Sequence, residues 1–86
     1  MIRAYFDEPA AMQFRDWLTS SPRTAVKIFD LVRAKEQSPF EGVGKPERLK
    51  HNLKGLWSRR ITQEHRLVYK VEEDAIIILS CYGHYE

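Results

Sequence analysis

The feature that most constrains the fold is an uninterrupted run of apolar residues near the C-terminal end, Ala75 to Leu79. The run is far too short to span a bilayer, and its length is typical of a buried strand. Because side chains alternate along a strand, consecutive apolar positions need cover on both faces of the sheet. We therefore predict a central strand over Ala75 to Cys81 that is packed on both sides.

Three further segments have strand character, and each is bounded by turn residues or charges. The acidic turn Glu72–Asp74 would join the third of them to the central strand, which favours an antiparallel hairpin. The three segments are Met1–Phe6, Leu56–Thr62 and Arg66–Val71.

Two helices are predicted between the first and second strands. Asp7 is suited to cap the first helix, while Ser21 and Pro22 suit the cap and first position of the second. Ser38–Pro39 ends the second helix. The expected apolar stripes are Ala10, Phe14, Trp17 and Leu18 in the first helix, and Ala25, Ile28, Phe29 and Val32, flanked by Leu31, in the second.

The resulting order, β-α-α-β-β-β, predicts an α+β fold in which a helical hairpin packs on a mainly antiparallel four-stranded sheet. Between Phe40 and Asn52 the periodicity is lost, and we expect a loop with room for one helical turn around Glu47–His51. At 86 residues the chain is expected to form a single domain, 1–86.

The cysteine content and the hydropathy pattern bear on the compartment. A single cysteine, Cys81, excludes an intrachain disulfide framework and favours a reducing environment. No secretion signal or membrane span is recognisable in the sequence. We expect a cytoplasmic protein without a membrane partner, in which Cys81 is a buried structural thiol.

Positive charge is concentrated in the stretch Lys45–Lys70. Its eight basic and two acidic residues give a charge of +6, and because the whole chain carries +2 the remainder carries −4. An asymmetry of this kind indicates a polyanionic partner.

Two arginines of this stretch fall on neighbouring predicted strands. Arg60 and Arg66 share a face of the sheet only if an odd number of residues connects the strands. We predict that Thr62 pairs with Arg66 across the three-residue loop Gln63–His65, which points both arginines and Val68 the same way. A two-residue turn would place the arginines on opposite faces.

Three residue types needed for RNA cleavage are present. Without a metal, such cleavage needs a base for the 2′-hydroxyl proton, an acid for the departing 5′-oxygen and fixed positive charge on the phosphate. Glu47 can be the base, His84 the acid and Arg66 the phosphate ligand. Further contacts to RNA could come from Lys50, Arg60, and Tyr82 or Tyr85.

Simpler interpretations compete with this one. Glu47 can be a solvated glutamate, Arg59, Arg60 and Arg66 the wet face of a sheet, and His84 part of a functionally silent tail. The cationic stretch can also bind an anionic ligand without catalysis. A zinc site would need Cys81 and His84 joined by the unpaired His51 and His65, and no metal or other cofactor is predicted. The aromatic residues Phe14, Trp17, Phe29 and Trp57 are expected in the core.

A long stretch of the chain resembles the YoeB (Txe) toxins of bacterial type II toxin–antitoxin systems, which are relatives of RelE. The resemblance extends to the terminal His84-Tyr85, and it is weakest over the two helices. The residues that carry it are Pro39-Phe40-Glu41-Gly42-x-Gly44-Lys45-Pro46-Glu47-x-Leu49-Lys50-His51-Asn52-Leu53-x-Gly55-x-Trp57-Ser58-Arg59-Arg60-Ile61-Thr62-x-Glu64-His65-Arg66-Leu67-Val68-Tyr69.

The resemblance implies an endoribonuclease that cuts messenger RNA in the ribosomal A site and leaves a 2′,3′-cyclic phosphate and a free 5′-hydroxyl. By position it implies Glu47 as general base, Arg66 as phosphate ligand and His84 as general acid. Supporting contacts to the substrate fall on Lys50, Arg60 and Tyr85.

The resemblance also implies partners. A cognate YefM-like antitoxin inhibits toxins of this family, which often form homodimers, and operator DNA would be bound only through the antitoxin complex. The chain departs from some relatives at Tyr82-Gly83, where they carry an arginine, and Glu86 adds an acid beside the tail. The alternatives are a catalytically silent RNA- or DNA-binding module that acts with its antitoxin in autorepression, and a domain that docks an acidic protein.

Overall fold

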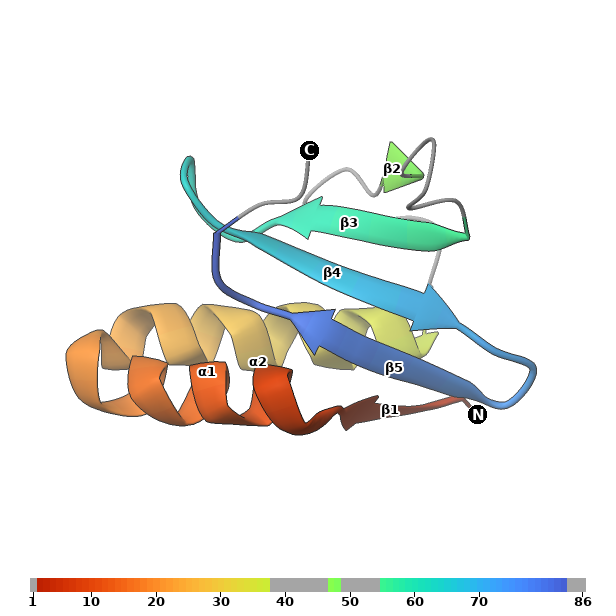
Figure 1. Cartoon of the computed structure of the whole chain (residues 1–86), viewed down its shortest axis with the longest axis horizontal. Helices are drawn as coiled ribbons and strands as arrows, with labels where there is room; N and C mark the ends of the chain where they lie inside the picture. The colour runs from red at the N-terminus through yellow and green to blue at the C-terminus, as the bar shows by residue number, and fades with distance from the viewer. Residues whose placement is uncertain (1, 38–46, 49–54, 84–86) are drawn as a thin grey trace.

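The computed structural model describes residues 2–37, 47–48 and 55–83, and this part of the chain forms two helices and five strands (Figure 1). The elements confirm the predicted order and add one short strand between the second helix and the hairpins. They are β1 (Arg3–Phe6), α1 (Glu8–Ser20), α2 (Pro22–Gln37), β2 (Glu47–Arg48), β3 (Leu56–Arg60), β4 (Arg66–Val71) and β5 (Ala75–Ser80).

The strands form one mixed sheet in the order β1-β5-β4-β3-β2. Among the described strands only β1 and β5 run parallel, and the other three pairings are antiparallel, which confirms the predicted mainly antiparallel sheet; the pairing of β2 with β3 adds a fifth strand that the sequence does not predict. The apolar run of β5 lies between β1 and β4, which confirms that it forms an interior strand. The pairing of β4 with β5 shifts between Val68 and Tyr69, where Val68 lies opposite Ser80 and Tyr69 opposite Ile78.

The helical hairpin is fixed by side chains at its ends. The carboxylate of Asp7 accepts a hydrogen bond from the amide of Ala10 at 3.1 Å, as expected of the cap of α1. Ser21 serves both helices, because its amide donates to the carbonyl of Trp17 at 2.9 Å and its hydroxyl accepts from the amide of Thr24 at 3.4 Å. Neither described helix is long and apolar enough to cross a bilayer.

The helices pack on one face of the sheet and form the core with it. The predicted burial of Phe29 is wrong, since this side chain is 57% exposed, and Leu18 is 54% exposed. In α2 the buried positions are Ala25, Ile28, Leu31, Val32 and Lys35. With about 100° of rotation per residue, Phe29 is turned aside from that stripe. It helps to line an apolar depression of about 230 Å³ with Phe14, Leu18, Ala25 and Val26.

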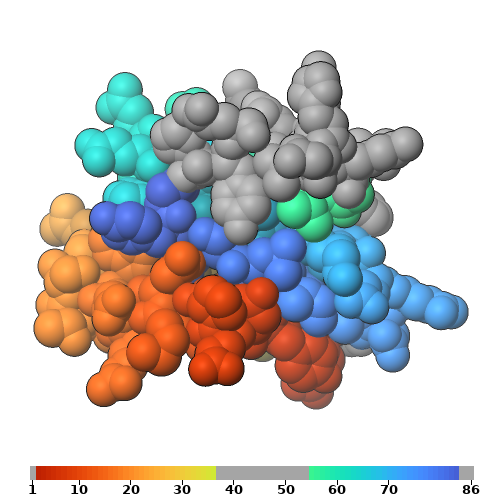
Figure 2. All heavy atoms as spheres, in the orientation of Figure 1, coloured from red at the N-terminus to blue at the C-terminus, as the bar shows by residue number. Residues whose placement is uncertain are grey.

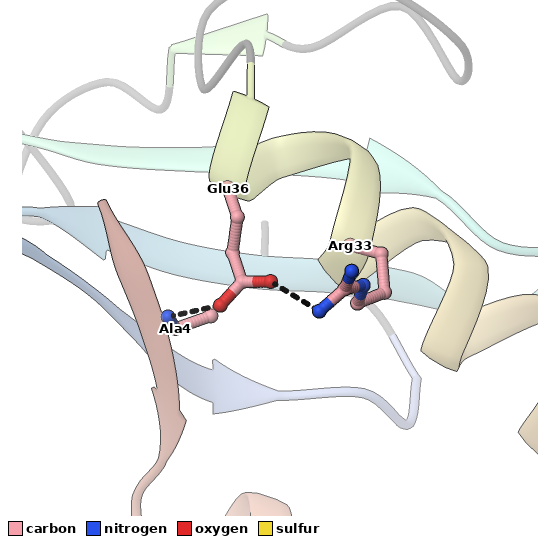
Figure 3. Close-up of polar contacts among 3 residues, drawn as sticks. All are labelled: Ala4, Arg33 and Glu36. Carbon is pink, nitrogen blue, oxygen red and sulfur yellow. Dashed lines mark hydrogen bonds and ion pairs between the residues drawn. The ribbon is translucent and has the colours of Figure 1, made fainter. Parts of the chain in front are cut away.

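The edge strand β1 is tied to the end of α2 by one carboxylate (Figure 3). Glu36 accepts a hydrogen bond from the amide of Ala4 at 2.9 Å, and its other oxygen lies 3.5 Å from a guanidinium nitrogen of Arg33. An edge strand offers unpaired amides to other chains, and Glu36 occupies one of them.

Two local predictions are wrong. Glu47 and Arg48 are extended in β2 and are not part of a helical turn; the rest of the predicted turn lies outside the described residues. Thr62 does not pair with Arg66, because β3 ends at Arg60 and Arg60 itself lies opposite Arg66. The hydroxyl of Thr62 accepts from the amides of Glu64 and His65, both at 3.2 Å, and this local bonding replaces the predicted extension of the strand.

Candidate active site

The face of β3 and β4 that points away from the helices carries the two predicted arginines. Arg60 and Arg66 lie directly opposite each other, and Ser58 lies opposite Val68 on the same face. The prediction that the arginines share a face is therefore confirmed, because the true connection, like the predicted one, has an odd number of residues. The predicted strand register is wrong, but it puts the arginines on the same face because both connections are odd in length.

Ser58 orients Arg66 on this face. The Nε–H of Arg66 donates to the Ser58 hydroxyl oxygen at 3.0 Å, and Ser58 is only 1% exposed. A guanidinium held at Nε by a buried hydroxyl has a restricted orientation. No motif in the sequence assigns Ser58 a role, although the alternation of side chains along β3 puts it on the same face as Arg60.

Arg60 and Arg66 place two basic residues directly opposite each other on neighbouring strands. Guanidinium groups suit a phosphate in particular, because their planar array of N–H donors matches its oxygens. The arrangement of Arg60 and Arg66 is thus suited to a phosphate group.

Glu47 lies in β2, the neighbour of β3 in the sheet. In the pairing of β2 with β3, Glu47 is opposite Ser58, the residue that bonds to Arg66. The predicted base and the predicted phosphate ligand therefore come from segments that are close in the fold. The side chain of Glu47 lies outside the described part of the structure, as does the whole of Lys50.

The C-terminal segment reaches the same end of the sheet. The carbonyl of Gly83 accepts a hydrogen bond from the amide of Arg66 at 2.8 Å, and the amide of Gly83 donates to Nδ1 of His65 at 2.9 Å. Gly83 has a φ of +69°, a conformation that glycine adopts without strain. The predicted acid, His84, follows directly in the sequence, but His84 and Tyr85 lie outside the described residues.

Helix α1 holds the segment that precedes Gly83. The indole N–H of Trp17 donates to the carbonyl of Cys81 at 2.9 Å, and the side-chain oxygen of Gln13 accepts from the amide of Cys81 at 2.7 Å. In Figure 2 the last described residues, in dark blue, lie directly against α1, in orange. Trp17 therefore has a second role beside the predicted core packing, and neither its role nor that of Gln13 has a local sequence signal.

The alternative zinc site is not supported. Cys81 is fully buried, with its thiol 3.6 Å from the carbonyl oxygen of Ala10, and burial raises its pKa to about 12. It is the buried structural thiol that the sequence predicts. Nδ1 of His65 accepts from Gly83, while His51 and His84 lie outside the described residues. Among the residues described, no three metal-ligating side chains cluster.

The cationic face is the face of β3 and β4 that carries Arg60 and Arg66, and Arg59 does not belong to it. It is 0% exposed and lies on the opposite side of β3 from Arg60, in register with Leu67. Burial lowers its pKa, and nearby Tyr69 acts in the opposite direction. The interpretation of Arg59 as part of a wet face is therefore wrong, whereas Arg60 is exposed as expected.

Comparison with known proteins identifies the family of the chain. Residues 6–85 match the family model described as YoeB-like toxin of bacterial type II toxin-antitoxin system. Toxin YoeB of Escherichia coli K12 is 54% identical over 69 residues, which cover 80% of this chain and 82% of the relative.

Two solved structures from Staphylococcus aureus have the same fold. One is a YoeB dimer, with a TM-score of 0.89, 39% identity and coverage of 98% of both chains. The other is a YoeB–YefM complex, with a TM-score of 0.88, 38% identity and coverage of 99% of both chains. The chain belongs to the family of YoeB-like toxins of bacterial type II toxin–antitoxin systems.

Proposed function

We propose that this toxin is a ribosome-dependent endoribonuclease that cuts messenger RNA in the A site and thereby stops translation. The reaction is a transesterification by acid and base groups of the protein, with Glu47 as base, His84 as acid and Arg66 as ligand of the scissile phosphate. Lys50, Arg60 and Tyr85 contact the substrate.

The observation that carries this proposal is the arginine pair on the face of the sheet that points away from the helices. Arg60 and Arg66 lie opposite each other, and Arg66 is bonded through Nε to Ser58 at 3.0 Å. Glu47 and Gly83 are distant in the sequence, yet Glu47 lies opposite Ser58 of β3 and the carbonyl of Gly83 accepts from the amide of Arg66 in β4. The support is that β2 and the C-terminal segment both adjoin the hairpin that carries the two arginines.

In the proposed reaction the carboxylate of Glu47 takes the proton of the 2′-hydroxyl, and the 2′-oxygen forms a bond to phosphorus. The bond from phosphorus to the 5′-oxygen breaks, and the imidazolium of His84 gives its proton to that oxygen. The products are a 2′,3′-cyclic phosphate and a 5′-hydroxyl. Negative charge grows on the phosphate during the step, and Arg66 stabilises it.

The partners follow from the same proposal. The Staphylococcus aureus relative is described in complex with YefM and as a dimer, and we propose a YefM-like antitoxin and a homodimer for this chain as well. The antitoxin would neutralise the cationic face, and operator DNA would be bound only by the toxin–antitoxin complex.

Cleavage of ribosome-bound message by the wild type, Glu47→Ala and His84→Ala tests the proposal. Loss of one acid or base group should lower kcat about 10²- to 10⁴-fold while ribosome binding is retained. Wild-type product should carry the cyclic phosphate. Undiminished cleavage in both variants would contradict the assigned roles, and a wild type that binds ribosomes but never cleaves would point to a catalytically silent binding module.

A further inference from the structure

His65 lies in the connection between β3 and β4, and its ring is enclosed by two aromatic side chains. The ring centroid lies 4.8 Å from that of Trp17, in an edge-on arrangement with an interplanar angle of 84°. It lies 4.7 Å from the ring of Tyr82, tilted by 46°. These contacts come from α1 on one side and from the C-terminal segment on the other.

The imidazole is also the acceptor of a specific hydrogen bond. Nδ1 of His65 accepts from the amide of Gly83 at 2.9 Å. The next residue, Arg66, donates its own amide to the carbonyl of Gly83 at 2.8 Å. Both polar groups of the Gly83 backbone are thus bound by two consecutive residues of the β3–β4 hairpin.

This double attachment bears on the proposed acid and on the phosphate ligand at once. Arg66 holds Gly83 through its backbone and Ser58 through its side chain. His84 is one peptide bond beyond Gly83. A shift of the Gly83 backbone would therefore move the point from which the His84 residue extends, relative to Arg66.

We propose that His65 is a positioning residue that fixes the C-terminal segment against β4, so that the segment delivers the acid to the phosphate held by Arg66. The aromatic contacts fix the ring, and the ring fixes Gly83. The expected effect of His65 on the cleavage rate rests on the proposed ribonuclease function. The attachment of Gly83 to His65 can be measured without any reaction.

Two substitutions separate the hydrogen bond from the packing. His65→Phe keeps an aromatic ring between Trp17 and Tyr82 but has no acceptor. His65→Asn gives up most of the ring but has a side-chain oxygen at about the position of Nδ1. Gln63→Ala is the matched control, because Gln63 is exposed in the same connection.

The first measurement is hydrogen exchange of the Gly83 amide by NMR in the free toxin. Loss of one hydrogen bond in His65→Phe should raise the exchange rate roughly 3- to 10-fold, with much less change in His65→Asn and none in Gln63→Ala. Equal exchange in the wild type and His65→Phe would show that His65 does not hold Gly83. Thermal unfolding of each variant shows that the compared proteins are folded.

The second measurement is steady-state cleavage of ribosome-bound message. His65→Phe should lower kcat roughly 3- to 10-fold with KM unchanged, and His65→Asn should recover most of the loss. Faster exchange at Gly83 with unchanged kcat would overturn the positioning role. If the wild type itself fails to cleave, the proposed function falls, and the exchange data still decide whether His65 fixes the segment.

Discussion

Arg59 and Arg60 are neighbours in the sequence, yet they occupy opposite environments. Arg60 is exposed at the end of β3 and lies opposite Arg66. Arg59 is 0% exposed, and its three guanidinium nitrogens have no hydrogen-bond partner within the part of the chain that the structure describes. The alternation of side chains along a strand is enough to separate them.

The difference shows that a count of basic residues overstates the charge a ligand can reach. Ser58-Arg59-Arg60 resembles one basic motif, but only Ser58 and Arg60 share a face with Arg66. Arg59 instead bears the cost of burying a charge without a bonded partner. The cationic face is thus defined by the register of β3 and β4 more than by the density of arginines.

The largest expected effect is at Arg66, on the face that points away from the helices. Arg66→Lys keeps the charge but loses the planar fork and the Nε–H that Ser58 binds, and kcat for message cleavage should fall about 10²-fold. Arg60→Lys is the matched control, with a clearly smaller loss because the proposal gives Arg60 only a supporting contact. Equal losses of kcat in the two variants would contradict the proposal that Arg66 binds the scissile phosphate and that Arg60 makes only a supporting contact.

On the face that points towards the helices, a substitution at Arg59 should raise the stability of the fold. Arg59→Met replaces a buried, unbonded cation by an apolar side chain of similar length, and we expect the free energy of unfolding to rise by about 1–3 kcal/mol. Arg60→Met, at an exposed position, should change it by less than about 0.5 kcal/mol. Urea denaturation measures both. A marked loss of stability in Arg59→Met would mean that the guanidinium contributes favourably to the folded state.

Alkaline pH should destabilise the protein through two buried groups, the thiol of Cys81 and the phenol of Tyr69. Burial raises the pKa of Cys81 from 9.0 to about 12 and that of Tyr69 from 10.0 to about 12. Above pH 9 the unfolded chain gives up protons that the folded chain retains. Stability should therefore fall as pH rises from about 9 to about 12, by up to about 1.4 kcal/mol per pH unit and group.

Urea midpoints at a series of pH values test this prediction, with Cys81→Ala as the comparison. Removing the thiol should flatten the decline just above pH 9, where the unfolded thiol would otherwise ionise first. An identical slope in the variant and the wild type would exclude a contribution from Cys81.

The helices and most strands are predictable from the sequence, because the residues that start, end or pattern each of them lie close together in the chain. The cap at Asp7, the Ser21–Pro22 junction and the run at Ala75–Leu79 each act within a few residues. The register of β3 with β4 was missed because the hydroxyl of Thr62 bonds to two amides of the connection and ends the strand early. Phe29 was misplaced because several apolar residues of α2 compete for one buried stripe.

The candidate site was predictable in part. Alternation along the strands was sufficient to place Arg60 beside Arg66 despite the register error. The bonds from Trp17 and Gln13 to Cys81, and from Gly83 to His65, join segments far apart in the sequence and have no periodic signal. The roles of Glu47, Lys50, His84 and Tyr85 stay predictions, since their side chains lie outside the described residues.

The most direct test of the division between the two faces is the NMR signal of each arginine Nε–H during titration with a short RNA that carries 2′-O-methyl groups and cannot be cleaved. The signals of Arg60 and Arg66 should shift on binding, while that of buried Arg59 stays in place. A bound RNA that shifts Arg59 and leaves the Arg60–Arg66 pair unchanged would contradict the account.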